Sequence, residues 1–254
     1  MTLKEKILRA QMSQRVEELK ARHAWLHGIA YNREEWDVFW HMTDNTTWAH
    51  QFGRMVGAEE VYYNSVTFTD ERCYRRFIKF TCDDPKTGRQ PTVPEYAGHD
   101  PHSTGRAGTH ALASSVIEVA ADNQSARSFF LTPGILMGPV GFEGVARDGF
   151  WLWERYGSDF VMVDGQLMWF HEQVCPDMGA DYDDQNWAHD RYLDAKKEDV
   201  VVGELGGVPA HLTEPGLIHC DYTVYQPVQN TVPPPTPYET LDDDNTYSKG
   251  RNTY

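Results

Sequence analysis

The order of the predicted elements indicates an α+β fold, with helices first and a curved antiparallel sheet afterwards. The front of the chain has patterns compatible with helices at residues 8–31 and 34–42. Extended patterns follow at residues 109–119 and 125–137, and residues 149–170 read as two aromatic-rich strands. Helices and strands that are separated along the chain in this way are typical of α+β domains.

The strands are predicted to follow one another as an antiparallel meander. Asp164 and Gly165 supply the positive φ values that a tight hairpin requires, so the segment 149–170 folds back on itself there. Another connection, at residues 121–124, joins the two strands that precede this hairpin. Four long strands in sequence therefore form the predicted sheet.

The helical part contains three predicted helices. The first has Leu19, His23 and Leu26 near one face. After the second helix, a short strand at 46–50 leads to the third helix near residues 58–64. The helical section thus precedes the sheet and carries one short strand inside it.

Two stretches lie outside these elements. Residues 82–106 contain several Pro and Gly and predict a long loop between the helices and the sheet, of the kind that often forms a lid or a binding loop. Residues 177–254 predict a C-terminal extension or arm that packs on the same or a neighbouring subunit. We therefore expect one domain over residues 1–176, with the inserted loop, followed by the arm.

The composition excludes several classes of protein. The chain has 254 residues, 40% of them hydrophobic, and can bury a sizeable core. Its 23 Lys and Arg against 38 Asp and Glu give a net charge of −15, which argues against nucleic acid and against anionic membranes as partners. The sequence has no membrane-spanning apolar run, no signal-peptide pattern and no CxxC among its four cysteines. We expect reduced thiols and a cytoplasmic protein.

Several residues, taken in order and spacing, carry a resemblance to a known superfamily. They are the turn at 44–45 with its short strand, residues 57–60, His110 seven residues before Ile117, Ala126, and residues 156–161 running into Asp164 and Gly165. Over residues 15–176 the chain resembles the SnoaL-like branch of the nuclear transport factor 2-like superfamily. That resemblance implies a cone-shaped α+β barrel, in which a strongly curved mixed or antiparallel sheet wraps around the N-terminal helices.

His110 is the first candidate catalytic residue. Alternation along a strand places it on one face with Leu112, Ser114 and Val116. The resemblance implies a pocket histidine at this position, where an imidazole acts as a base or, once protonated, as the acid for a departing hydroxyl. A histidine that is hydrogen-bonded in a packed sheet is the alternative.

The chain also departs from the superfamily pattern. SnoaL-like dehydratases and isomerases often have a Tyr and an Asp on or just after the first helix, where this chain has His27 and Asn32. An Asn cannot act as a general base, so we expect a catalytic set that differs from the usual His and Asp pair. His27 and the neighbouring Tyr31 are candidate substrate-binding residues.

Further candidates are predicted near the mouth of the cone. His50 ends the short strand, Tyr62 and Tyr63 lie on the third helix, and Arg76 lies on a predicted helix at 70–80. An Arg in a low-dielectric cavity stabilises a phenolate or alkoxide. His50, Tyr62 and Arg76 are therefore candidate catalytic residues, and Tyr63 is a candidate substrate-binding residue. For the arginine, an ordinary surface ion pair is the alternative.

The later strands add candidates for substrate binding. Trp151 and Phe170 offer flat surfaces on which an aromatic substrate could stack. Glu154 shares its strand face with Leu152 and Tyr156, so it becomes a candidate acid or base if that face points inward. Packing in the core is the alternative for the two aromatic residues.

No cofactor or metal is expected. The sequence lacks GxGxxG, Walker and GxSxG motifs, and His99 and His102 form only a weak metal-ligand pair in a loop. A cofactor-independent mechanism is the consistent interpretation.

Two classes of function remain open. In length, in the insertion at 82–106 and in aromatic content, the chain resembles the sphingomonad diarylpropane lyases. That resemblance implies a lyase that removes a benzylic hydroxyl from a lignin-derived diol, giving a quinone methide, and then releases formaldehyde and a stilbene. The alternatives are a dehydratase or isomerase of a hydroxylated polycyclic or polyketide-like substrate, and a non-catalytic binding protein. The expected partners are a small aromatic substrate and further copies of the chain in a homo-oligomer.

Overall fold

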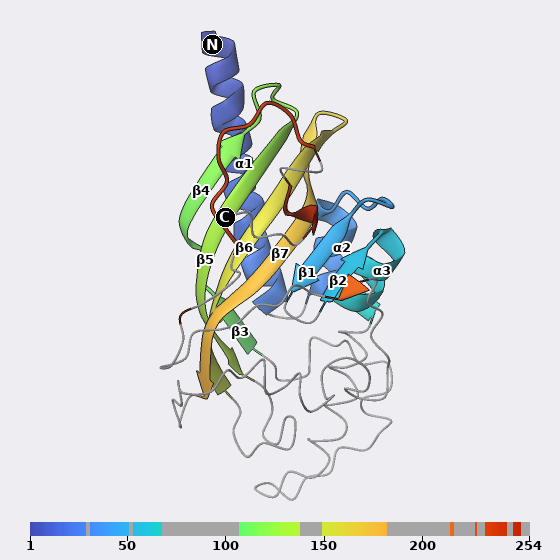
Figure 1. The fold of residues 1–254 in the computed structure, drawn as a ribbon, viewed down its shortest axis with the longest axis vertical. Coiled ribbons are helices and arrows are strands. Elements are labelled where there is room, and N and C mark those ends of the chain that lie inside the picture. Colours follow the sequence, from blue (N-terminus) through green and yellow to red (C-terminus); the bar gives the residue numbers. More distant parts are fainter. Residues whose placement is uncertain are drawn as a thin grey trace, which may run out of the picture.

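The computed structural model shows a long helix packed against a curved sheet (Figure 1). It describes residues 1–28, 31–50, 53–67, 107–137, 149–181, 214–215, 227, 232–242 and 246–249. The loop predicted at 82–106, the helix predicted at 70–80 and Arg76 on it lie outside the described residues. No helix in the described part of the chain is long and apolar enough to cross a membrane.

The helices predicted at 8–31, 34–42 and 58–64 are confirmed, and the first begins earlier than predicted. The helices are α1 (Leu3–Gly28), α2 (Asn32–Phe39) and α3 (Ala58–Tyr62), which continues as a π-helical turn, η1 (Tyr63–Thr67). The backbone N–H of Glu5 donates to Thr2 Oγ1 at 3.2 Å, and the N–H of Thr2 donates to Glu5 Oε2 at 2.6 Å. Because this reciprocal capping box satisfies N–H groups at the helix start, α1 begins at Leu3.

Eight strands of the described chain form one sheet. They are β1 (Thr47–His50), β2 (Gly53–Val56), β3 (Ala107–His110), β4 (Ala113–Val119), β5 (Ser125–Met137), β6 (Gly149–Val163), β7 (Gln166–Asp181) and β8 (Glu214–Pro215). Their spatial order is β3-β5-β6-β7-β1-β2-β8, and β4 also pairs with β5. Strand β1 is parallel to β7, and the other pairs are antiparallel. The predicted α+β class with a curved mixed sheet around the N-terminal helices is confirmed, and the described strands do not close into a barrel.

The predicted hairpin is also confirmed. Asp164 (φ 49°) and Gly165 (φ 81°) form the turn between β6 and β7. The register between these two strands shifts next to Glu154 and next to Phe160. Such bulges bend a strand and increase its twist, which contributes to the curvature of the sheet. The sequence pattern does not reveal them.

The single strand predicted at 109–119 is wrong, because the segment forms two strands that pair with different parts of β5. Ser114 has a positive φ of 50°, and the register shifts between Ala113 and Val116. Regular alternation is therefore broken, so His110 is buried while Ser114 is exposed. Strand β2 is a second difference, since the sequence pattern predicts only a connection there.

The core lies between α1 and the concave face of the sheet, with α1 running along this face (Figure 1). Met12, Val16 and Leu19 of α1 are buried and belong to the same apolar cluster as Phe130 and Phe160 from β5 and β6. Burial of these side chains holds the helix against the sheet. It also fixes the direction in which the polar residues in the second half of α1 point.

Part of the C-terminal arm, red in Figure 1, lies on the other face of the sheet. Tyr247 and Val232 of the arm form a second apolar cluster with Phe129 and Cys175. The backbone N–H of Tyr247 donates to Asp159 Oδ2 at 2.7 Å. The described part of the arm therefore packs on the sheet of its own chain.

Gly157 of β6 lies directly beneath side chains of the arm. A Cβ atom there would lie 2.5 Å from the ring of Tyr247 and 2.6 Å from Val232 Cγ1. We expect Gly157→Ala to lower the free energy of unfolding by about 1–3 kcal/mol, because overpacking displaces the arm. Denaturant unfolding measures this loss, and Tyr247→Ala is the matched background. If the clash is the cause, the loss shrinks when Tyr247 is already Ala; an equal loss in both backgrounds contradicts it.

Candidate active site

The second half of α1 presents polar side chains to the concave face of the sheet. Lys20, His23 and His27 are spaced three and four residues apart and therefore share one face of the helix. Opposite them, Glu154, Tyr156 and Ser158 alternate along β6 and point to the same side as the buried core. Helix and sheet thus bring two rows of polar residues together in the interior.

His110 lies at the end of β3 and is 6% exposed. Its Nδ1 is 3.4 Å from Glu154 Oε2, and that same oxygen accepts a hydrogen bond from the Tyr156 hydroxyl at 2.8 Å. Neither ring nitrogen of His110 makes a hydrogen bond within the described residues. A buried imidazole beside a fixed carboxylate can exchange a proton with a bound molecule.

Gly134 explains why β3 can lie this close to β5. It is the register partner of His110, and a Cβ atom at this position would overlap the carbonyl oxygen of Thr109. Because only glycine lacks a Cβ, it permits this close approach of the two backbones. The position of His110 therefore depends on a glycine in the neighbouring strand.

His27 links His110 to the rest of the interior cluster. Its ring centroid is 5.6 Å from that of His110 and 5.3 Å from that of His23, on which it stacks. His27 Nδ1 lies 3.2 Å from Asn32 Oδ1. The amide oxygen of Asn32 is a hydrogen-bond acceptor here, not a base, so Asn32 supplies no general base beside His27.

A further histidine and carboxylate pair lies one helical turn before His27, nearer the N-terminus of α1. His23 Nδ1 is 2.9 Å from Glu35 Oε1, and the Trp40 indole N–H donates to the same oxygen at 3.3 Å. Glu35 is 1% exposed. Two nitrogen donors therefore fix this buried carboxylate, and the edges of the Tyr156 and Trp169 rings surround the imidazole.

Lys20 and Glu172 form a fully buried ion pair beyond His23, with Nζ 2.9 Å from Oε1. The other oxygen of Glu172 accepts hydrogen bonds from Ser158 Oγ at 2.5 Å and Trp169 Nε1 at 2.9 Å. Burial lowers the pKa of Lys20 and raises the pKa of Glu172, and in each case the opposite charge of the partner counteracts burial. Lys20 Nζ also lies over the rings of Trp169 and Tyr156 at 4.2 and 4.6 Å.

The structure brings three of the predicted site residues together: His110, Glu154 and His27. Sequence reasoning does not assign a site role to five residues that complete this cluster: Lys20, His23, Glu35, Tyr156 and Glu172. One signal could have found the first two, because a charged residue and two histidines at helical spacing continue the apolar face of α1. Glu35 and Glu172 come from separate elements, and no local pattern joins them to α1.

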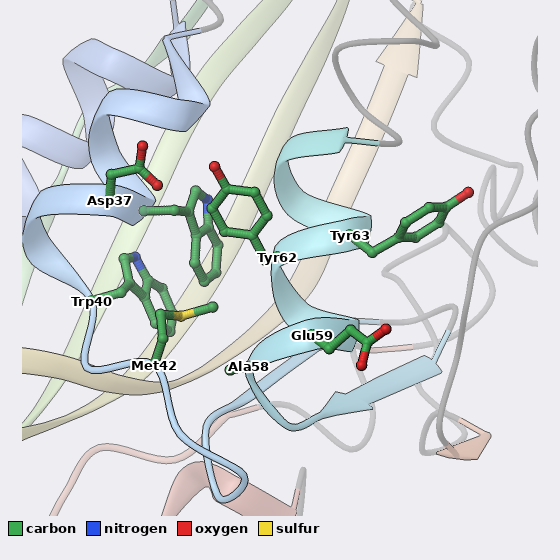
Figure 2. A pocket seen from close by; sticks show the side chains of 8 residues that line it. Asp37, Trp40, Met42, Ala58, Glu59, Tyr62 and Tyr63 are labelled. Atoms are coloured by element: carbon green, nitrogen blue, oxygen red, sulfur yellow. The ribbon is translucent and has the colours of Figure 1, made fainter.

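Tyr62 and Tyr63 lie elsewhere, at a cavity of about 640 Å³ between α2 and α3. Its lining residues are Trp36, Asp37, Trp40, Met42, Ala58, Glu59, Tyr62 and Tyr63. Figure 2 shows Tyr62 on the side of α3 that faces α2, whereas Tyr63 points away from α2. None of the three histidines of the interior cluster lines this cavity.

The remaining predicted residues are spread over the fold. Trp151 lies on the face of β6 opposite Glu154 and contacts Trp153, with ring centroids 5.8 Å apart. Phe170 lies at the register shift of β7 between Trp169 and His171, and its ring centroid is 4.0 Å from that of His171. Two further predicted site residues are described. The ring centroid of Tyr31 is 6.3 Å from that of Trp25, and His50 is the last residue of β1. Among the described residues, no three His, Cys, Asp or Glu side chains converge as a metal site.

Comparison with known proteins finds similarity in structure only. No family model and no curated protein matches the sequence. Three solved structures with a related arrangement are a proposed scytalone dehydratase from Novosphingobium aromaticivorans DSM 12444, the hexachlorocyclohexane dehydrochlorinase LinA-type3 from Novosphingobium barchaimii LL02, and a nuclear transport factor 2 (NTF2-like) superfamily protein from Salmonella enterica serovar Typhimurium.

These similarities are distant in every case. The sequence identities are 12%, 9% and 11%, and the TM-scores are 0.44, 0.45 and 0.42, respectively. The matches cover 68%, 69% and 65% of this chain and 89%, 93% and 91% of the solved chains. Similarity at this level identifies no reaction and no substrate, so the chemistry of this chain has to be argued from its own residues.

Proposed function

We propose that this chain is a SnoaL-like, cofactor-independent lyase that acts on a hydroxylated aromatic compound. One observation carries the proposal: His110 is buried 3.4 Å from Glu154 Oε2, and neither of its ring nitrogens has a hydrogen-bond partner among the described residues. A histidine that serves only packing would be expected to satisfy at least one ring nitrogen. An unsatisfied imidazole beside a carboxylate is suited to give and take protons.

The proposed substrate is a lignin-derived diarylpropane with a 1,3-diol and two guaiacyl rings. In the first step the para-phenol loses its proton and the benzylic hydroxyl leaves as water, which gives a quinone methide. In the second step the terminal hydroxyl loses its proton and the C–C bond that joins the hydroxymethyl carbon to the chain breaks, so that carbon and its oxygen leave as formaldehyde. The electron pair of the broken C–C bond forms the stilbene double bond. The exocyclic double bond of the quinone methide moves its electron pair into the ring, which restores the phenolate, and the phenolate is then protonated. The products are a stilbene, water and formaldehyde.

His110 supplies the proton transfers at the two aliphatic hydroxyls. As an imidazolium it protonates the benzylic hydroxyl, and as the resulting neutral imidazole it takes the proton of the terminal hydroxyl. Glu154 stabilises the imidazolium, and the Tyr156 hydroxyl holds that carboxylate in place. Because one proton is given and one is taken back, His110 returns to its starting state after each turnover.

A substrate analogue in which both phenols are methylated tests this mechanism. The analogue keeps both aromatic rings and the diol, but no phenolic proton can be removed to expel the benzylic hydroxyl. We expect it to bind, seen as a raised melting temperature, and to release no formaldehyde. Formaldehyde release from the methylated analogue at the rate of the free phenol would contradict the quinone methide.

The same melting experiment separates the alternative functions. Hydroxylated polycyclic and polyketide-like alcohols are measured beside the guaiacyl dimers. Stabilisation by these alcohols, with turnover to a dehydrated or isomerised product, would favour a dehydratase or isomerase. Stabilisation without turnover of any compound would favour a binding protein.

A further inference from the structure

We propose that His23, with Glu35 behind it, is a second catalytic base and takes the phenolic proton of the substrate. This inference rests on the proposed function, because it assigns a residue to a proton transfer that the lyase reaction requires. His110 serves the aliphatic hydroxyls, and the phenolic oxygen lies at the opposite end of a para-substituted ring. A single imidazole cannot reach both ends at once, so a second acid–base group is needed.

The geometry of His23 is that of an oriented base. Glu35 is held by the Trp40 indole and lies 2.9 Å from Nδ1 of the imidazole, so in the neutral ring Nδ1 carries the hydrogen. Nε2 is then the basic nitrogen, and it has no hydrogen-bond partner among the described residues. A carboxylate that fixes the tautomer in this way also stabilises the imidazolium that forms.

His23 is also more accessible than its partner. Its side chain is 14% exposed, against 2% for Glu35. Part of the His23 side chain is therefore accessible, whereas the carboxylate stays enclosed. Tyr156 and Trp169 contact the ring at centroid distances of 5.7 and 5.2 Å, and aromatic groups of this kind favour an aromatic ligand at the same place.

His27 contacts the rings of both proposed bases. Its ring centroid is 5.3 Å from that of His23 and 5.6 Å from that of His110. The two histidine and carboxylate pairs therefore belong to one continuous cluster in the interior. The proposal places the phenol of a para-hydroxylated ring at the His23 pair and its benzylic hydroxyl at the His110 pair, with the ring beside His27.

Glu35 is the group that makes a proton transfer from a phenol to His23 feasible. A phenol ordinarily loses its proton near pH 10, whereas an imidazole ordinarily binds one near pH 6.5, so the imidazolium has to be stabilised. The Glu35 carboxylate, 2.9 Å from Nδ1, supplies this stabilisation. Lys20 lies one helical turn before His23 and contacts the same Tyr156 and Trp169 rings, but Glu172 is its counter-ion.

The two bases complete one catalytic cycle without a net change. His23 takes the phenolic proton when the quinone methide forms and returns it when the phenolate is restored. His110 gives a proton to the leaving hydroxyl and takes one from the terminal hydroxyl. No oxidant, reductant or external acid is required.

The binding test uses a diguaiacylpropane that lacks both hydroxyls of the diol, so that it can bind but cannot react. Near-ultraviolet absorbance reports how much of its phenol is ionised when bound. We expect the wild-type protein to ionise the bound phenol at a pH at least one unit below that of the free compound, and His23→Gln to abolish this shift. His41→Gln is the matched control, since His41 packs on Phe170 outside the cluster. Glu35→Gln is a second variant and is expected to reduce the shift.

A turnover test uses the diol substrate with and without fluorine beside the phenol. His23→Gln is expected to lower turnover of the unfluorinated substrate on the order of 10²-fold. For the fluorinated substrate the loss should be less than about tenfold, because fluorine makes the phenol more acidic and a weaker base can then remove its proton. The loss in His110→Gln should be the same for both substrates. The assignment of His23 would be overturned if His23→Gln lowered turnover of both substrates by the same factor. It would also be overturned if His23→Gln left the ionisation of the bound phenol unchanged. Ionisation that depends on His23 without any formaldehyde release would retain the phenol site and overturn the proposed reaction.

Discussion

Replacing His110 by Gln is expected to lower turnover by a factor on the order of 10² or more while leaving the melting temperature nearly unchanged. In the proposed cycle the imidazole is the group of the His110 and Glu154 pair that gives and takes the proton, and the carboxylate stabilises it. Gln retains similar size and polarity but cannot act as an acid or base. Steady-state formaldehyde release and thermal unfolding of the same preparations measure the two effects.

The control for this variant is His41→Gln, which changes a histidine outside the interior cluster and should leave turnover unchanged. Glu154→Gln is expected to cause a smaller loss than His110→Gln, because it weakens the stabilisation of the imidazolium but keeps the proton carrier. Unchanged turnover in His110→Gln would make His110 a packing residue. A large fall in melting temperature would show that the loss of activity follows from unfolding.

The fold was largely predictable because its signals are local. Asp164 and Gly165 favour a tight turn with positive φ values, and the aromatic strands on either side of this turn predict a hairpin. The break between β3 and β4 was not predictable, because Ser114 adopts a positive φ that its residue type rarely favours. Tertiary pairing with β5 decides that conformation.

The candidate site was predictable only in part, for the same reason. Glu154 lies on a strand whose inward face follows from alternation, whereas for His110 only the resemblance implied a place in the pocket, because alternation breaks between β3 and β4. The contact between His23 and Glu35 joins α1 to α2, and the contact between Lys20 and Glu172 joins residues 152 positions apart. Such pairings depend on how α1 lies against the sheet, and no spacing in the sequence contains that information.

The buried ion pair leads to the largest expected effect on stability. Replacing Lys20 by Met leaves the Glu172 carboxylate without its counter-ion in an interior where both side chains are almost completely inaccessible. We expect the free energy of unfolding at neutral pH to fall by about 3–5 kcal/mol, as for other buried pairs that lose one partner. Lys6→Met, on the exposed start of the same helix, should change it by no more than about 0.5 kcal/mol.

The pH dependence separates a lost charge partner from lost packing. Burial raises the pKa of Glu172 above its ordinary value of 4.5, so the folded protein binds a proton on this residue more tightly than the unfolded chain does. In Lys20→Met, stability should therefore increase as the pH falls through the raised pKa of Glu172 and should reach its full value below pH 4.5. Adding Glu172→Gln removes the group that titrates, so this dependence should disappear and about 1 kcal/mol or more of stability at neutral pH should return. A loss in Lys20→Met that is the same at every pH would instead assign the whole effect to packing of the lysine side chain against Trp169 and Tyr156.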